Sequence, residues 1–442
     1  KGHKIIPTVG LLYRPIPVSA PAAEGRAQSS AGGGGAHSAA ANSQQRRGYM
    51  LIIKNCNLIT MAGIYKEHYD VAIEEGKFAR IEKNLTPAPG DQVVDAGGKL
   101  VTPGFIEPHC HLGMLSSAGE DGNEKTDPIH PELRAIDAID FHSETFTQAL
   151  HAGVTTLAVG PGSSNLMGGT FVFIKSAGET LKERIIREEG ALKMALGENP
   201  RLNYSRRNQT PTTRMGSAAL MRQTLYRAKE YREKWLAHQE KLERGEESTF
   251  HFDLAMHSLM RAFDGMLVKI HAHQANDILT AIRIAEEFGL NLSIEHCTEG
   301  WMMTDTLKEA GAHYILGPTI GGKSKLEVQN KRYDAPALLE QAGIEFTLTT
   351  DSHVIPMEGF LPQVAILIAN GLSEETAYRC VTIYAAKALD LGDELGSIEP
   401  GKTADLVVWA VDPFETGGKP ETVVINGKIV YQRTEAGEET IC

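Results

Sequence analysis

Long hydrophobic runs are absent from this sequence of 442 residues. A helix that crosses a bilayer needs roughly 20 consecutive apolar residues, and no stretch of the chain approaches that length. We therefore expect neither an integral membrane protein nor a membrane partner. Paired cysteine spacings are missing as well, since the five cysteines are an odd number scattered along the chain. This pattern fits a reducing, cytoplasmic location better than a secreted disulfide framework.

Basic residues are in the minority, with 44 Lys and Arg against 56 Asp and Glu and a net charge of −12. The first 49 residues hold six Lys or Arg and only one Glu, so the remaining chain is more acidic than the whole. An acidic body repels the phosphate backbone. We therefore expect no nucleic-acid partner and a small molecule as substrate. Separately, we expect a homo-oligomer.

Residues 1–49 differ in composition from the rest of the chain. The stretch from Ala20 to Arg47 is rich in Ala, Gly and Ser and shows no apolar periodicity, which predicts a disordered or non-native extension. It also lacks the compact apolar core and small-residue cleavage site that are typical of a signal peptide.

Short strands are predicted at both ends of the remaining chain, and an Asn426-Gly427 pair between the last two predicts a tight hairpin turn. Because the two ends share this pattern, residues 50–103 and 398–436 are predicted to form one composite β-sandwich domain. The predicted strands are Leu51–Asn55, Asp70–Ile73 and Phe78–Ile81 at the start, and Ala404–Trp409, Thr422–Ile425 and Lys428–Tyr431 at the end.

Residues 104–397 alternate between apolar strand candidates and helical patterns such as Ile278–Phe288 and Ala335–Ala342. Eight such strands favour an α/β fold of the (β/α)8 TIM-barrel type, with a doubly wound open sheet as the alternative. No GxGxxG follows a first strand, which argues against dinucleotide binding. The strand candidates are Val101–Ile106, Val154–Val159, Phe171–Ile174, Ala191–Leu196, Met266–Ile270, Leu292–Ile294, Tyr314–Leu316 and Phe346–Thr349.

A helical insertion is predicted at about residues 200–262, between the fourth and fifth strands. Its part from Ser217 to Gly245 is strongly charged. A solvated helix face explains such a pattern, and a lid or an oligomer contact is the alternative.

His109 and His111 form the most specific motif in the chain. Alternate residues of a strand point to the same side, so both imidazoles can converge on one point. At the carboxyl end of a first barrel strand they face the mouth, where the active sites of barrel enzymes lie. Converging imidazoles suit Zn, Fe, Mn or Ni, so this pair predicts a metal site.

Three further strand candidates end in residues that commonly bind metals. Because the carboxyl ends of parallel barrel strands share one rim, these side chains are expected near His109 and His111. They are His271 and His273 after the fifth strand, His296 after the sixth, and Asp351 and His353 after the eighth.

The segments VVDAGGKLVTPGFIEPHCHLG and GSIEPGKTADLVVW resemble the frame of the amidohydrolase superfamily, and the resemblance runs from about Met50 to Gln432. It implies a composite β domain joined to a barrel that holds one or two divalent metal ions, zinc first, with Fe, Mn or Ni as alternatives. In the family pattern His273 contacts substrate or supports the ligands. His353 follows Asp351 by two positions, so we expect it to line the pocket. The implied metal ligands are His109, His111, His271, His296 and Asp351.

Lys193 lies inside the apolar fourth strand, where a buried and unpaired lysine would be costly. The segment is similar to the fourth strand of dihydropyrimidinase-type and prolidase-like members, in which a carboxylated lysine bridges two metals. The resemblance therefore implies the same role for Lys193. An ordinary salt bridge of Lys193, or a bridging carboxylate from Glu198, are the alternatives.

The resemblance implies a metal-dependent hydrolase of an amide or cyclic amide C–N bond other than a peptide bond, as in prolidase-like and imidazolonepropionase-like members. Asp351 would take a proton from the metal-activated water and pass it to the leaving nitrogen. Deamination of an aminated heterocycle is an alternative, although the Glu that family deaminases place near the fifth-strand His is absent from His271–Asp277. A non-catalytic scaffold is the other alternative, and the filled ligand positions argue against it.

Overall fold

The structure is a computed structural model that describes residues 49–63, 65–116, 119–434 and 436–441. The disorder expected for residues 1–49 concerns a segment that, apart from Tyr49, lies outside these ranges. None of the helices within them is both long and apolar enough to cross a membrane.

The central sheet has eight strands in the order β15-β14-β13-β12-β11-β10-β9-β6. This nearly closed sheet confirms the predicted barrel. Its strands β9, β10 and β12 are buried along their whole length, as expected for strands that are covered on both sides. The strands are β6 (Phe105–Cys110), β9 (Val154–Val159), β10 (Met167–Lys175), β11 (Ile185–Ala195), β12 (Leu267–Ala272), β13 (Asn291–His296), β14 (His313–Leu316) and β15 (Thr347–Leu348).

Strand β10 departs from the strict alternation of parallel strands and helices. It pairs antiparallel with both β9 and β11, whereas the other neighbours in the barrel pair parallel. The connections before and after β10 are residues 160–166 and 176–184. Both are shorter than the dozen or more residues that a parallel crossover requires, so the chain turns back on itself as hairpins.

The predicted first strand, Val101–Ile106, is divided between two sheets, so its prediction as one barrel strand was wrong. Residues Leu100–Pro103 form β5 in the composite sheet, and the barrel strand β6 begins at Phe105. The break falls at Gly104, where a Cβ atom would lie only 2.2 Å from Thr155 Oγ1. One unbroken apolar run could not reveal this division, because both halves are equally buried.

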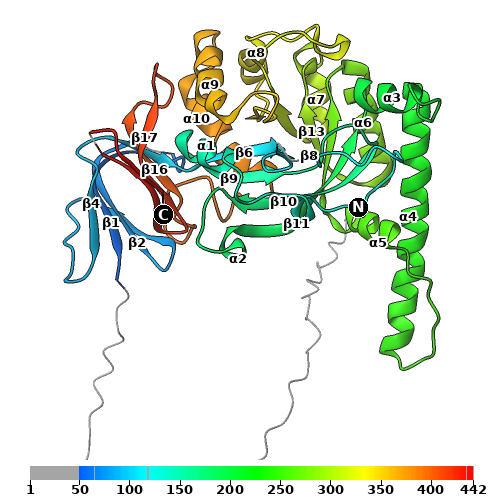
Figure 1. Ribbon diagram of the computed structural model, residues 1–442, viewed down its shortest axis with the longest axis horizontal. Coiled ribbons are helices and arrows are strands. Elements are labelled where there is room, and N and C mark those ends of the chain that lie inside the picture. Colours follow the sequence, from blue (N-terminus) through cyan, green and yellow to red (C-terminus); the bar gives the residue numbers. More distant parts are fainter. Residues whose placement is uncertain (1–48, 64, 117–118, 435, 442) are drawn as a thin grey trace, which may run out of the picture. The chain divides into compact units, whose positions relative to one another are not determined.

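The second sheet combines strands from the two ends of the chain in the order β19-β18-β17-β16-β5-β1-β2-β3, with β4 paired to β1. The halves join where β5 pairs antiparallel with β16, and Figure 1 shows the blue and red strands side by side. The composite β domain is thereby confirmed, while its limits at 50–103 and 398–436 stay a prediction. Its strands are β1 (Leu51–Ile59), β2 (Tyr65–Glu74), β3 (Lys77–Glu82), β4 (Gln92–Asp95), β5, β16 (Leu406–Val411), β17 (Lys419–Ile425), β18 (Lys428–Arg433) and β19 (Glu439–Ile441).

The turn between β17 and β18 is the predicted tight hairpin. Asn426 and Gly427 have φ angles of 50° and 76°, and positive φ at both central residues is what a type I′ turn requires.

Helices surround the barrel sheet, and the predicted insertion corresponds to α3–α5 (Figure 1). Helix α4 begins after Thr213, whose side chain caps Gly216 N, and it buries Met221 and Leu225 on one face. The α-helices are α1 (Thr145–His151), α2 (Leu181–Arg184), α3 (Glu198–Ser205), α4 (Arg214–Glu243), α5 (Leu254–Met260), α6 (Ala275–Phe288), α7 (Thr304–Ala310), α8 (Ala335–Gln341), α9 (Phe360–Ala369), α10 (Glu374–Cys380) and α11 (Ile383–Ala388). The short remaining elements are the 3-10 turns η1 (Ala135–Asp137), η2 (Arg261–Asp264), η3 (Gly300–Met302), η4 (Leu326–Val328) and η5 (Met357–Gly359), and the hairpin strands β7 (Leu115–Ser116) and β8 (Gly119–Glu120).

Candidate metal centre

His109, His111 and Asp351 come together at the mouth of the barrel. The two histidines lie at the carboxyl end of β6, and Asp351 follows β15 with a positive φ of 51° that turns the chain inward. Asp351 Oδ1 lies 3.2 Å from His111 Nε2 and 3.7 Å from His109 Nε2. The ligand atoms of all three residues lie within 4.8 Å of one another, which makes the group able to hold a metal ion.

A second group of possible ligands consists of His271, His273 and His296. Their ligand atoms also lie within 4.8 Å of one another, and the three rings are buried. The resemblance had left His273 to substrate or to a supporting role, whereas the structure groups it with His271 and His296. Because His271 and His273 alternate at the end of β12, both rings point to the same side.

Hydrogen bonds at Nδ1 orient four of these rings. The carboxylate or carbonyl partners of His109, His111 and His296 can only accept, so they fix the proton on Nδ1 and leave Nε2 free for a metal, whereas the Thr298 hydroxyl beside His273 can donate or accept. The pairs are His109 with Glu295 Oε2 (2.5 Å), His111 with Gly160 O (2.6 Å), His296 with Gly317 O (2.6 Å) and His273 with Thr298 Oγ1 (2.7 Å).

Burial lowers the pKa of His109, His271, His273 and His296 below the usual histidine range. These imidazoles are therefore neutral at physiological pH, which is the form that binds metals. Burial raises the pKa of Asp351, but the electrostatic influence of His296, the hydrogen bond with His111 and the charge of Lys193 together outweigh it, and the carboxyl pKa lies below its usual value. Neutral imidazoles around a carboxylate are a donor set that fits a divalent ion such as zinc.

The structure brings Lys193 to the histidines and does not bring Glu198 there. Lys193 is fully buried, and its Nζ lies 3.2 Å from His109 Nε2. Burial lowers the pKa of its amine to about 8. Glu198, the first residue of α3, accepts a hydrogen bond from Glu327 N at 3.3 Å and belongs to neither group of ligands.

Buried charges beneath the histidines were missed by the sequence reasoning. Glu295 is fully buried in β13, and its Oε1 pairs with Lys269 Nζ at 2.9 Å and accepts a hydrogen bond from Ser293. Fully buried Lys and Glu side chains are rare unless they are paired. A charged residue inside an otherwise apolar strand, as Lys269 and Glu295 are, was therefore the feature of the sequence that could have predicted a buried ion pair.

Glu327 was also missed, because it lies in the short 3-10 turn η4, within the stretch between β14 and α8. Its side chain is fully buried, with Oε1 at 3.5 Å from His271 Nε2. No periodic pattern surrounds it in the sequence, so only the folded chain reveals that it reaches the histidines.

A cavity of about 500 Å³ opens above the two groups of ligands and is lined by His111, His271, His273 and Asp351. His353 lines it as well, and its ring centroid lies 6.2 Å from that of His111. The cavity therefore offers room for a small molecule next to the candidate ligands.

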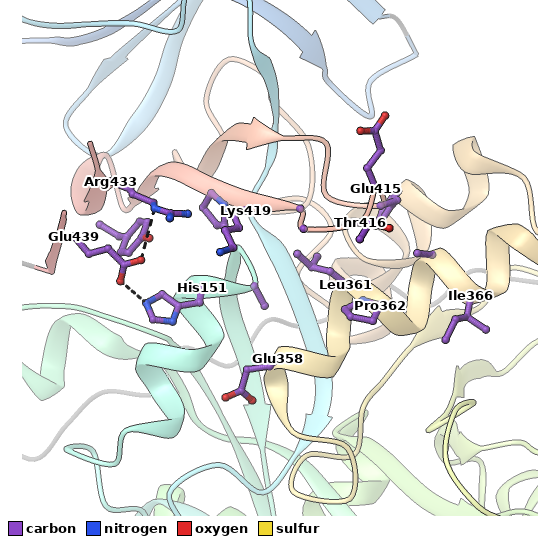
Figure 2. A pocket seen from close by; sticks show the side chains of 17 residues that line it. His151, Glu358, Leu361, Pro362, Ile366, Glu415, Thr416, Lys419, Arg433 and Glu439 are labelled. Carbon is purple, nitrogen blue, oxygen red and sulfur yellow. Dashed lines mark ion pairs between the residues drawn. The ribbon is translucent and has the colours of Figure 1, made fainter. Parts of the chain in front are cut away.

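A second cavity, of about 560 Å³, lies between α1, α9 and the strands β17 and β18 (Figure 2). Among its charged groups, Glu439 pairs with His151 at 3.2 Å and with Arg433 at 3.9 Å. Neither group of candidate metal ligands lines it. The slightly smaller cavity at the barrel mouth is thus the one that adjoins the candidate metal ligands.

Comparison with known proteins gives consistent matches. A model of the amidohydrolase family matches residues 100–430. The solved structure of an amidohydrolase from Thermotoga maritima is 37% identical, with a TM-score of 0.82, and the match covers 87% of this chain and 100% of that one. Imidazolonepropionase from Bacillus velezensis is 26% identical over 377 residues, which are 78% of this chain and 84% of that protein.

Amidohydrolase tasK from Hapsidospora irregularis is 27% identical over 396 residues, which are 81% of this chain. The chain spans only 39% of that relative's length.

Proposed function

The chain belongs to the amidohydrolase family, and on that premise we propose that it is a metal-dependent hydrolase of an amide or cyclic amide C–N bond outside extended peptide chains. The observation that carries the proposal is the pair of ligand groups that face one cavity at the barrel mouth. The similarity to an imidazolonepropionase over most of both chains supports a cyclic amide.

The proposed metal ligands are His109, His111, His271, His296 and Asp351, joined by Lys193 in a carboxylated form. A divalent ion bound by these residues would supply hydroxide at neutral pH and polarise the scissile carbonyl. Zinc fits the donor set best, with Fe, Mn or Ni as alternatives.

Asp351 carries the proton in this proposal. Its pKa lies below the usual carboxyl value, so the group is ionised at neutral pH and ready to accept a proton from the attacking water. Because Asp351 also lines the cavity, it can pass that proton to the leaving nitrogen. His353, which lines the same cavity, would contact the substrate.

Lys193 would carry the carbamate. Its neutral amine would attack carbon dioxide to form an N–C bond, and one proton would leave to solvent. Burial favours the neutral amine, since it lowers the pKa to about 8. The resulting carbamate would be an anion beside His109 where a protonated amine would be a buried, unpaired cation, and its oxygens would be available as metal ligands.

A substrate screen tests the proposed reaction. Purified, metal-loaded protein would be offered dipeptides, N-acyl amino acids, cyclic amides and aminated heterocycles. We expect turnover of an amide or cyclic amide, with carboxylate formation at the cleaved carbonyl. Ammonia released only from the heterocycles would support a deaminase instead, and a protein that holds no stoichiometric metal would support a non-catalytic scaffold.

We further propose that the protein acts as a homo-oligomer on a small molecule in the cytoplasm, without a nucleic-acid partner. Cys56, Cys110, Cys297 and Cys380 are free and buried, which supports a reducing compartment. Light scattering on the eluted protein measures the oligomeric state directly.

A further inference from the structure

Glu327 reaches the histidines of the barrel mouth from outside the strand ends. We propose that its carboxylate is a further protein ligand of the ion at the second group of ligands, on the side of His271 and His273. The inference rests on the metal centre of the proposed function, but it does not depend on which reaction that centre performs.

The distances around Glu327 Oε1 fit ligands that share one ion. Oε1 lies 3.5 Å from His271 Nε2 and 3.7 Å from His273 Nε2. Tetrahedral zinc holds nitrogen and oxygen ligands at about 2.0–2.2 Å, which places neighbouring ligand atoms roughly 3.3–3.6 Å apart. Both separations are longer than those of a hydrogen bond, so they match atoms separated by an ion better than atoms bonded to each other.

The same atoms have unmet bonding capacity. Glu327 is 0% exposed, yet within the described part of the chain its Oε1 accepts no hydrogen bond. His271 is likewise buried, with neither of its ring nitrogens hydrogen-bonded to a described residue. A buried carboxylate oxygen and a buried imidazole nitrogen left unpaired are costly, and a cation placed between them satisfies both.

The chain positions the carboxylate through its second oxygen. Glu327 Oε2 accepts a hydrogen bond from Glu198 N at 2.8 Å, and Glu198 Oε2 accepts one from Glu327 N at 3.3 Å. A Cβ atom on Gly197 would lie 2.7 Å from Glu327 Oε2, so this glycine, with a φ of 88°, leaves the room the carboxylate needs. Glu198 thus positions Glu327, and Oε1 remains free to face the histidines.

A salt bridge with Lys325 is the alternative reason for the buried carboxylate of Glu327, and the experiment must distinguish this salt bridge from metal binding. Its Nζ lies 3.6 Å from Glu327 Oε1, with 43% of the lysine side chain exposed. A lysine at that distance and exposure is a weak partner for a fully buried carboxylate. The salt bridge with Lys325 explains neither the short distance from Oε1 to His271 nor the absence of hydrogen bonds at the two ring nitrogens of His271 within the described chain.

Titration of the metal-free protein with Co²⁺ alone tests the proposal. Glu327→Gln keeps the size of the side chain and removes its charge. We expect affinity for one Co²⁺ ion to fall by more than about 10²-fold, beyond the 10–100-fold typical of groups that only support a ligand. The visible absorption of that ion should also change, while the ion at His109, His111 and Asp351 stays bound.

The matched control is Glu299→Gln. Glu299 is a buried carboxylate whose two oxygens accept hydrogen bonds from Ala275 N and Asn330 Nδ2, so it has no oxygen directed to an ion. This variant should keep the Co²⁺ affinities of the parent protein, and so should Lys325→Met.

Thermal unfolding of the metal-free proteins gives a second readout. If Glu327 is a ligand, metal-free Glu327→Gln should unfold at the same or a higher temperature than the metal-free parent, because an uncompensated buried charge is gone. Co²⁺ should then raise its unfolding temperature less than it raises that of the parent.

Two results would overturn the assignment: unchanged Co²⁺ affinities in Glu327→Gln, or equal weakening in Glu327→Gln and Lys325→Met. Both leave the proposed hydrolysis untouched. Absence of turnover in a protein that binds Co²⁺ as expected would instead contradict the proposed function alone.

Discussion

His109 Nδ1 lies 2.5 Å from Glu295 Oε2, across the barrel and 186 positions away in the sequence. Both side chains are fully buried, and Glu295 also pairs with Lys269. A carboxylate behind a metal-binding histidine fixes the proton on Nδ1 and makes Nε2 a stronger ligand. This contact connects the chemistry at the mouth to the charges in the barrel interior.

Changing Glu295→Gln should weaken metal binding about 10–100-fold, because the support of His109 is lost. It should also lower the free energy of unfolding by about 3–5 kcal/mol, because Lys269 becomes a buried, unpaired cation. Chelator competition measures the first effect and urea unfolding the second. Adding Lys269→Met should restore stability without restoring metal affinity. If that double variant regained full affinity, Glu295 would not act through His109.

Changing His109→Ala should abolish turnover and lower the metal content while the protein stays folded. The substitution removes the imidazole Nε2 that lies beside Asp351, which also approaches His111, so the ion would lose one of its proposed ligands. Metal analysis and circular dichroism measure the two properties separately. The control is His142→Ala, since the His142 side chain is 100% exposed. Full metal content and activity in His109→Ala would contradict the ligand assignment.

Changing Lys193→Ala should lower the metal content toward one ion per chain and cut activity severely, if its carbamate bridges two ions. Short carboxylic acids added to this variant should restore part of the activity by filling the vacated position. Glu198→Ala provides the comparison, because Glu198 is the alternative bridging carboxylate. Two ions retained in Lys193→Ala, with one lost in Glu198→Ala, would transfer the bridging role to Glu198.

Stability of the metal-free protein should fall as the pH drops below about 6.5. Burial lowers the histidine pKa values in the folded chain, so the unfolded chain takes up protons near pH 6.5 that the folded chain does not. Stability linked to these groups is therefore present above that pH and lost below it. Urea unfolding across this range measures the slope, and His271→Gln should reduce it. An unchanged slope would exclude His271 as a contributor.

Changing Asp405→Asn should destabilise the protein by about 3–5 kcal/mol, because it leaves a buried lysine without its counter-charge. Lys175, at the end of β10, is 3% exposed and lies 2.5 Å from Asp405, which precedes β16. The control is Glu421→Gln, whose partner Lys99 is 35% exposed, and which should cost less than about 1 kcal/mol. Because Lys175 belongs to the barrel and Asp405 precedes a strand of the composite sheet, we expect this pair to stabilise the contact between them. Equal losses of unfolding free energy in Asp405→Asn and Glu421→Gln, measured by urea unfolding, would contradict this role.

The barrel and the candidate ligands could be predicted from the sequence because their signals are local. Apolar strands recur along residues 104–397, and carboxyl ends of parallel barrel strands share one rim. His296 at the end of β13 and Asp351 after β15 were therefore expected to approach His109, as they do. The Asn426-Gly427 hairpin was predictable for a similar reason, since its turn depends on the conformations that two adjacent residues favour.

Only the tertiary structure decided the rest, because those features depend on partners that are distant in the sequence. The division at Gly104 is set by Thr155, and the role of Glu295 is set by His109. Glu327 lies in a segment without periodicity, so its position beside His271 arises only when η4 packs against the start of α3. Periodicity along the chain records which residues are buried, but it does not record which buried residues meet.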